Sequence, residues 1–193
     1  SGFADEIAIC DAFPKFAEGQ AMDLVQGQPF VPQVQVHAGS DADFADSDIV
    51  CVTAGAKQKP GETRIDLLKR NAGIVADIAR RVAVSGCSGV MVIVSNPVDV
   101  LTKIALDASG WTRDRVIGSG TVLDSGRFRY ALARDAKVDA RNVHGYILGE
   151  HGDSEFAAWS LTSIAGQRMD DFCKFCCGTC VDRGAKRREE IVK

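Results

Sequence analysis

The strongest constraint on the fold is a regular alternation of short apolar runs with longer stretches of helical period. The apolar runs have the length of strands, and the stretches between them place apolar residues on one helical face. The run at 47–53, SDIVCVT, is almost continuously apolar, which is typical of a strand covered on both faces in a parallel sheet. Repeated strand–helix units predict an α/β fold with a right-handed parallel sheet. The expected strands are 6–10, 34–37, 47–53, 90–94 and 115–118, and the expected helices are 15–25, 65–84, 98–109 and 121–136.

The pattern changes near residue 120, and the segment 142–148 is strand-rich. A chain of 193 residues favours one domain, or one domain and part of another. We therefore expect one domain over 1–119 and the beginning of a second, of α+β type, over 120–193.

Composition and charge exclude several classes of protein. Lys and Arg total 23 against 26 Asp and Glu, a net charge of −3, so no global basic field attracts nucleic acid or an anionic membrane. The longest apolar run, 90–94, is too short to span a bilayer, and the N-terminus has neither the basic nor the apolar region of a secretory signal. We expect a cytoplasmic protein with no nucleic-acid or membrane partner.

The seven cysteines fall into two groups. Cys10, Cys51 and Cys87 lie in or beside apolar runs, and we expect them to be small buried residues in a reduced compartment. The other four lie in FCKFCCGTC, within Cys173–Cys180. Its two C-x-x-C pairs have the spacing of zinc ligands or a redox pair, but the long loop that usually separates ligand pairs is absent. Surface thiols without a metal are the favoured interpretation.

Asp11 follows the first apolar run directly. An acidic residue at the end of a strand suits the ribose hydroxyls of a dinucleotide. The glycine-rich phosphate loop that would precede it by about 20 residues does not occur in this sequence. A helix N-cap for the stretch 15–25 is an equally good interpretation of Asp11.

Other candidate chemical groups lie at strand ends or near the start of the second domain. His151, in GEHGDS, is flanked by glycines after an apolar run, which suits an accessible general acid or base, although it also fits an ordinary turn. Asp124 and Arg127 are three residues apart, so they share a helix face. There they suit the orientation of an imidazole and the binding of a substrate carboxylate, or a plain surface ion pair.

Two further candidates lie in a Gly- and Pro-containing loop after the strand 47–53, and one lies before a proline after the strand 90–94. Parallel sheets bind ligands at the carboxyl ends of their strands, which favours a binding role, whereas a solvated loop is the simpler alternative. The residues are Gln58 and Arg64 in the first loop and Asn96 in the second.

Four long motifs, in this order, resemble the bacterial L-lactate dehydrogenases of the lactate/malate dehydrogenase family. The resemblance covers nearly the whole chain, and it implies an NAD-dependent Rossmann domain followed by an α+β catalytic domain, assembled as a homotetramer. The family's first strand with its GxGxxG loop, and its C-terminal third, have no counterpart here. We therefore expect a sheet with one central position empty, and no activity from the 193 residues alone. The motifs are TAGAKQKPGETR (53–64), VSNPVDVLT (94–102), IGSGTVLDSGRFRY (117–130) and GEHGDSE (149–155).

The resemblance implies a catalytic role for several of these residues. His151 would exchange the proton with the substrate, and Asp124 would orient it. Arg127 would bind the substrate carboxylate. Arg64, on a closing loop, would polarise the carbonyl of a small 2-hydroxy or 2-oxo acid.

Other roles implied by the resemblance concern specificity and the cofactor, which would be NAD. Asn96 would contact the reacting oxygen, Gln58 would read the substrate side chain, and Asp11 would bind the adenosine ribose. The remaining residues of the cofactor groove would be Gly55, Ala56, Val94, Ser95, Asn96 and Ser119.

Two more residues, Arg129 and His144, match positions where bacterial members bind fructose 1,6-bisphosphate at a subunit interface. The alternative for Arg129 is a pair with a nearby acid such as Asp135. Malate dehydrogenase is the second candidate activity, and Gln58 argues against it because similar malate enzymes have arginine there. A non-catalytic interaction module is the third possibility.

Overall fold

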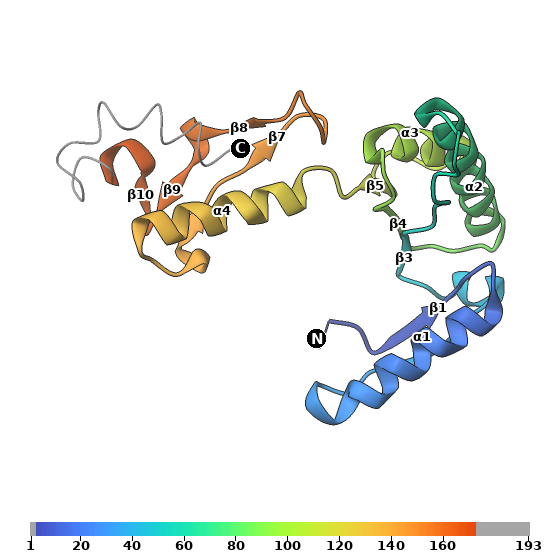
Figure 1. Ribbon diagram of the computed structural model, residues 1–193. Helices are drawn as coiled ribbons and strands as arrows, with labels where there is room; N and C mark the ends of the chain where they lie inside the picture. The colour runs from blue at the N-terminus through green and yellow to red at the C-terminus, as the bar shows by residue number, and fades with distance from the viewer. Residues whose placement is uncertain (1–2, 173–193) are drawn as a thin grey trace. The chain divides into compact units, whose positions relative to one another are not determined.

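The computed structural model describes residues 3–172, and the chain divides into two compact units, Ser1–Gly118 and Ser119–Lys193. Figure 1 shows their helices and strands, most of them labelled. The prediction for the cysteines of Cys173–Cys180 concerns residues outside the described range. Among the helices of residues 3–172, none is both long enough and apolar enough to cross a membrane.

The first unit contains parallel strands in two separate sheets. One sheet pairs β1 (Glu6–Ile9) with β2 (Gln35–Ala38), and the other has the order β3 (Ile49–Val52), β4 (Val90–Ile93), β5 (Val116–Gly118). Within residues 3–172, no pairing joins β1 to β3. The sheet is therefore parallel but interrupted, as the sequence predicts.

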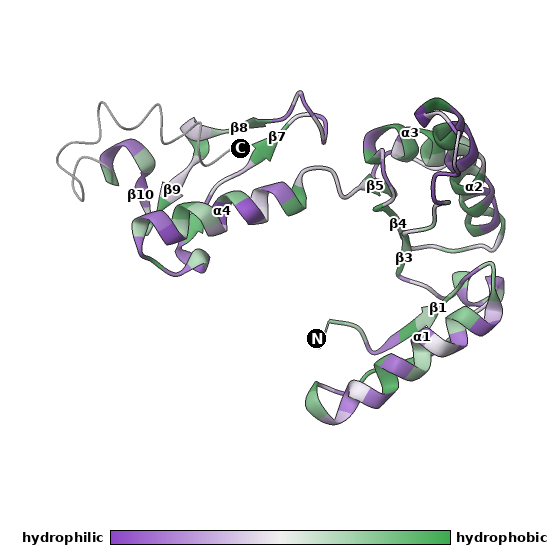
Figure 2. Cartoon of the chain, viewed as in Figure 1, coloured by the Kyte–Doolittle hydropathy of each residue, from purple (hydrophilic) through white to green (hydrophobic). Residues whose placement is uncertain are grey.

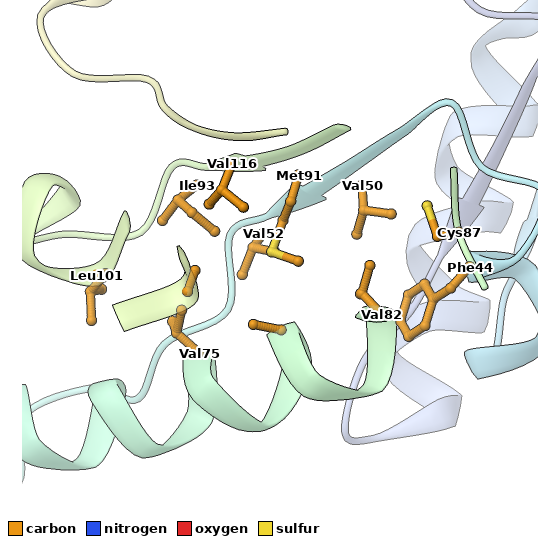
Figure 3. Packing of buried hydrophobic residues seen from close by; sticks show 12 residues of the cluster. Phe44, Val50, Val52, Val75, Val82, Cys87, Met91, Ile93, Leu101 and Val116 are labelled. Atoms are coloured by element: carbon orange, nitrogen blue, oxygen red, sulfur yellow. The ribbon is translucent and has the colours of Figure 1, made fainter. Parts of the chain in front are cut away.

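Three helices connect these strands. They are α1 (Pro14–Gly27), α2 (Arg64–Val84) and α3 (Val98–Ser109), and two 3₁₀ turns cover Gln28–Phe30 and Asp41–Phe44. Side chains of α2, α3 and the strands β3–β5 form one hydrophobic core. Figure 3 shows this core, and its labelled side chains are Phe44, Val50, Val52, Val75, Val82, Cys87, Met91, Ile93, Leu101 and Val116.

The prediction that both faces of β3 are covered is wrong. Val50 and Val52 are buried in the core, whereas Ile49 is 66% exposed and Cys51 is also exposed. Alternate strand residues point to opposite faces, and α2 and α3 pack on the face of the two valines. The burial expected for Cys51 is therefore wrong, and so is that expected for Cys10, which is exposed just past the end of β1. Of the three cysteines within residues 3–172, only Cys87 is buried.

The second unit begins with a long helix and continues with short strands. Figure 2 shows apolar and polar residues alternating along this helix, α4, as on an amphipathic helix. Phe128 of α4 packs edge-on against Trp159, with ring centroids 5.0 Å apart. The strands form antiparallel sheets of order β10-β9-β6 and β7-β8. The elements are α4 (Val122–Ala136), β6 (Val143–His144), β7 (Ile147–Leu148), β8 (Phe156–Ala157), β9 (Ser163–Ile164) and β10 (Gln167–Arg168), with 3₁₀ turns at Ala140–Asn142 and Trp159–Leu161.

Candidate active site

The backbone of β7 is attached to the beginning of α4 by two hydroxyl groups. Thr121 Oγ1 donates to the Ile147 carbonyl at 2.6 Å, and Ser125 Oγ accepts the Ile147 N–H at 2.9 Å. The chain then leaves β7 through Gly149, whose φ of +104° favours glycine. The loop that carries His151 therefore starts beside the first turns of α4.

His151 and Asp124 form the centre of this candidate site. His151 Nδ1 lies 2.7 Å from Asp124 Oδ2, and the Asp124 side chain is only 12% exposed. The other carboxylate oxygen, Oδ1, accepts a hydrogen bond from Arg127 Nη1 at 3.2 Å. A carboxylate on Nδ1 favours the tautomer in which Nε2 is the nitrogen that exchanges a proton. The three residues singled out in the sequence are thus linked through one carboxylate.

A second carboxylate, Glu155, lies on the same side of His151, and the sequence analysis missed it. Glu155 Oε2 is 3.6 Å from His151 Nδ1. The available signal was its spacing of four residues from the histidine, inside the motif GEHGDSE. Asp124, His151 and Glu155 each offer one atom that could bind a metal ion, and these three atoms lie within 4.8 Å of one another. The contacts between the imidazole and the two carboxylates account for the same three atoms, so we assign no metal here.

Gln58 and Arg64 lie on the first unit, in the segment between β3 and α2. Gln58 Nε2 donates to the Glu62 carbonyl at 2.7 Å, so its amide bonds within its own loop. Pro60 and Gly61 form a tight turn in this loop, and Gly61 has a φ of +79°. The turn is closed by a hydrogen bond from the Glu62 N–H to the Lys59 carbonyl. Arg64 is the exposed first residue of α2.

The residues proposed for the cofactor groove follow the carboxyl ends of parallel strands. Gly55 and Ala56 come after β3, Val94 to Asn96 after β4, and Ser119 directly after β5. The first two ends are tied together, because Ser95 Oγ donates to the Ala54 carbonyl at 2.6 Å. Val94 and Asn96 are exposed, whereas Ser95 is buried.

Asn71 of α2 is a second residue that the sequence analysis missed. Its Oδ1 accepts the Ala56 N–H at 2.8 Å, and its side-chain amide lies against Gly55. Asn71 is buried on the same helix face as Val75 and Ala79. A polar residue at a position of apolar spacing was the signal, because a buried amide needs a specific partner.

Asp11 is exposed beyond the end of β1, and its Oδ1 accepts the Phe13 N–H at 2.8 Å. The N-cap of α1 is Phe13, and it makes no side-chain capping bond. The N-cap interpretation of Asp11 is therefore wrong. The ribose interpretation stays a prediction.

Arg129 and His144 are neighbours in the second unit. Arg129 Nε donates to the carbonyl of Val143 at 2.7 Å, which is the residue before His144 on β6. His144 is exposed. The two side chains thus come from adjacent positions of α4 and β6.

Two family descriptions match consecutive parts of the chain. Residues 1–118 match the lactate/malate dehydrogenase NAD-binding domain, and residues 121–183 match the alpha/beta C-terminal domain of the same family. The chain belongs to the lactate/malate dehydrogenase family. The two compact units of the structure correspond to these two family domains.

Several members of this family are closely similar to the chain. An L-lactate dehydrogenase of Treponema denticola is 72% identical over 173 residues, covering 90% of this chain and 55% of the relative. One from Clostridium perfringens is 48% identical over 192 residues and is covered to 61% of its length. The crystal structure of the minor L-lactate dehydrogenase from Enterococcus mundtii in its ligands-bound form matches with a TM-score of 0.89 and 41% identity, over 98% of this chain and 61% of that one. The chain thus spans little more than half the length of these members.

Proposed function

We propose that the protein containing this chain is an NAD-dependent L-lactate dehydrogenase, which interconverts L-lactate and pyruvate. The observation that carries this proposal is the pair of His151 and Asp124, 2.7 Å apart. Oxidising a 2-hydroxy acid requires a group that accepts the hydroxyl proton, and an imidazole held by a carboxylate suits that task. The names of the similar dehydrogenases support the same activity.

In this proposal, the second unit holds the substrate and moves its proton. His151 accepts the hydroxyl proton of lactate and returns it during pyruvate reduction, while Asp124 keeps the ring oriented. Arg127, with most of its donors uncommitted to Asp124, binds the substrate carboxylate through two parallel hydrogen bonds.

The first unit contributes the groups that read and polarise the substrate. Arg64 supplies positive charge where the carbonyl oxygen becomes negative, an effect that is strongest when a closed loop excludes water. Asn96 donates to the same oxygen. Gln58 faces the uncharged methyl group of pyruvate and offers no cation to the second carboxylate of oxaloacetate.

NAD would supply the nicotinamide that accepts or donates the hydride. The fit to this chain rests on the segments that follow the carboxyl ends of the parallel strands, where such sheets bind dinucleotides; the exposed polar residues Asp11 and Asn96 lie in these segments. Asp11 would bind the adenosine ribose. The groove would be completed by Gly55, Ala56, Val94, Ser95, Asn96 and Ser119.

The test is a substitution of His151 in the full-length protein. His151→Gln should lower turnover by about 10²- to 10⁴-fold, the range of general acid–base contributions. NADH binding, measured by fluorescence titration, should be unchanged because the cofactor groove lies elsewhere. His37→Gln, at a partly exposed histidine on β2, is the matched control and should keep full turnover. Full turnover by His151→Gln would reject the assignment.

The same assays separate the alternative functions. A full-length protein that prefers oxaloacetate to pyruvate would be a malate dehydrogenase. One that turns over neither acid would favour an interaction module. The 193 residues alone should be inactive, because β1 and β3 do not pair with each other.

We also propose a cytoplasmic homotetramer that fructose 1,6-bisphosphate activates. Arg129 and His144 come from adjacent positions of α4 and β6, and with their symmetry mates they would form a four-residue basic pocket for two phosphates. The sugar bisphosphate should lower the KM for pyruvate in the parent and have no effect on Arg129→Gln. An unchanged KM in the parent would count against this regulation.

A further inference from the structure

The segment 54–63, which precedes α2, is fastened to that helix by two consecutive side chains. Asn71 holds its beginning through the Ala56 N–H. Arg70 holds its middle and its end: Nη2 donates to the Lys57 carbonyl at 2.8 Å and to Glu62 Oε2 at 2.9 Å. One guanidinium nitrogen therefore closes the segment onto the helix.

Glu62 is the partner that gives this closure its strength. Its carboxylate accepts the Lys59 N–H at 2.8 Å as well as the Arg70 bond, and its side chain is only 13% exposed. Its backbone carbonyl accepts the Gln58 amide. A partly buried ion pair with additional hydrogen bonds is costly to break on one side only, because the remaining charge loses its partner.

The contact is also incomplete. Arg70 Nε is buried and has no hydrogen-bond partner among the described residues. An unpaired buried donor is uncommon and calls for an explanation. The Arg70 guanidinium thus keeps one donor that the segment does not use.

We propose that Glu62 and Arg70 form a latch, a pair of positioning residues that sets how often the loop carrying Gln58 leaves α2. In the latched arrangement, the exposed Gln58 amide donates to the Glu62 carbonyl. Release of that bond frees the amide to turn towards a substrate with both of its N–H groups. The specificity part of this inference depends on the proposed dehydrogenase function, whereas the latch itself does not.

The direct test measures loop opening in the full-length protein by limited trypsin cleavage after Lys57, followed by mass spectrometry. Arg70→Gln removes the ion pair and should accelerate that cut about 10- to 100-fold, the factor expected when hydrogen bonds to a charged group are lost from a local opening equilibrium. Arg80→Gln removes the same charge from an exposed position of the same helix and should leave the rate unchanged. Equal rates for the two variants would overturn the latch.

A second variant and a second measurement guard against simple misfolding. Glu62→Gln keeps the side-chain size and one acceptor oxygen, so it should give a smaller acceleration than Arg70→Gln; no acceleration would also overturn the proposal. In the active parent, both variants should change the KM for pyruvate while leaving NADH affinity unchanged, since Asn71 still holds Ala56. Faster cleavage in a protein without any turnover would support the latch and reject the dehydrogenase function.

Discussion

Replacing Ser125 by alanine tests how the protein holds the loop of His151 against α4. Ser125 Oγ accepts the N–H of Ile147 at 2.9 Å, and Ile147 is 4% exposed. Alanine would leave this N–H buried without an acceptor, which costs about 1–3 kcal/mol. The Ile147 carbonyl keeps its bond from Thr121, so β7 should stay attached at one point. The expected loss corresponds to a factor of roughly 5 to 150 in the unfolding equilibrium.

The assay is urea unfolding of the full-length protein at one fixed protein concentration. The midpoint should fall while the slope stays the same, because the surface exposed on unfolding does not change. Turnover should fall as well, since β7 leads directly into the loop that carries His151. Ser160→Ala, at an exposed serine of the same unit, is the control and should stay within about 0.5 kcal/mol of the parent. If Ser125→Ala is as stable as this control, the reasoning fails.

Three further predictions concern single side chains. Asn71→Leu removes the acceptor of the Ala56 N–H and should weaken NADH binding about 5- to 30-fold, as measured by fluorescence titration. Gln58→Arg should shift the ratio of the kcat/KM values towards oxaloacetate by up to about 10⁴-fold, because arginine pairs with the second carboxylate; an unchanged ratio would show that this position does not read the substrate. Hydrogen bonds from the side chain and the backbone N–H of Arg141 lower the pKa of Asp139 from 3.8 to about 2. The contribution of the Asp139 carboxylate to stability is therefore present above pH 3.8 and is lost as the pH falls towards 2. Asp139→Asn should therefore lose less stability than the parent as the pH falls from about 4 towards about 2, as measured by urea unfolding.

The bounds of α2 and α3 agree with the sequence prediction to within one residue, and the ends of these helices carry local signals. Thr63 accepts the Asp66 N–H and starts α2, and Gly110 adopts the left-handed conformation that ends α3. The helix α1 is longer than expected at both ends. Its start, Pro14, occupies a favoured first-turn position that the apolar spacing alone did not reveal.

Burial was harder to predict than secondary structure. The run 47–53 is apolar throughout, yet Ile49 and Cys51 are exposed while Val50 and Val52 are buried. An apolar run indicates that both faces of a strand could be buried. Whether it is covered depends on the elements that pack there, and these belong to other parts of the sequence.

The candidate site shows the same limit in its chemistry. The sequence named His151, Asp124 and Arg127 as separate groups, and their resemblance to a known family suggested that they act together. The strand that leads to His151 is held beside α4 by the hydroxyls of Thr121 and Ser125, which bind both polar groups of the Ile147 backbone. No spacing rule marks these two hydroxyls, because their partner is a main-chain group far along the chain.

Three of the residues that were missed act in a similar way on the loop of Gln58, namely Asn71, Arg70 and Glu62. Each binds main-chain groups of the segment 54–63, so each controls where another side chain lies without itself having the character of a reactive group. Main-chain partners leave little trace in a single sequence, since every residue except proline offers the same N–H and carbonyl. A motif therefore identifies which side chains could react, whereas the geometry in which they react is set by polar residues whose partners only the fold reveals.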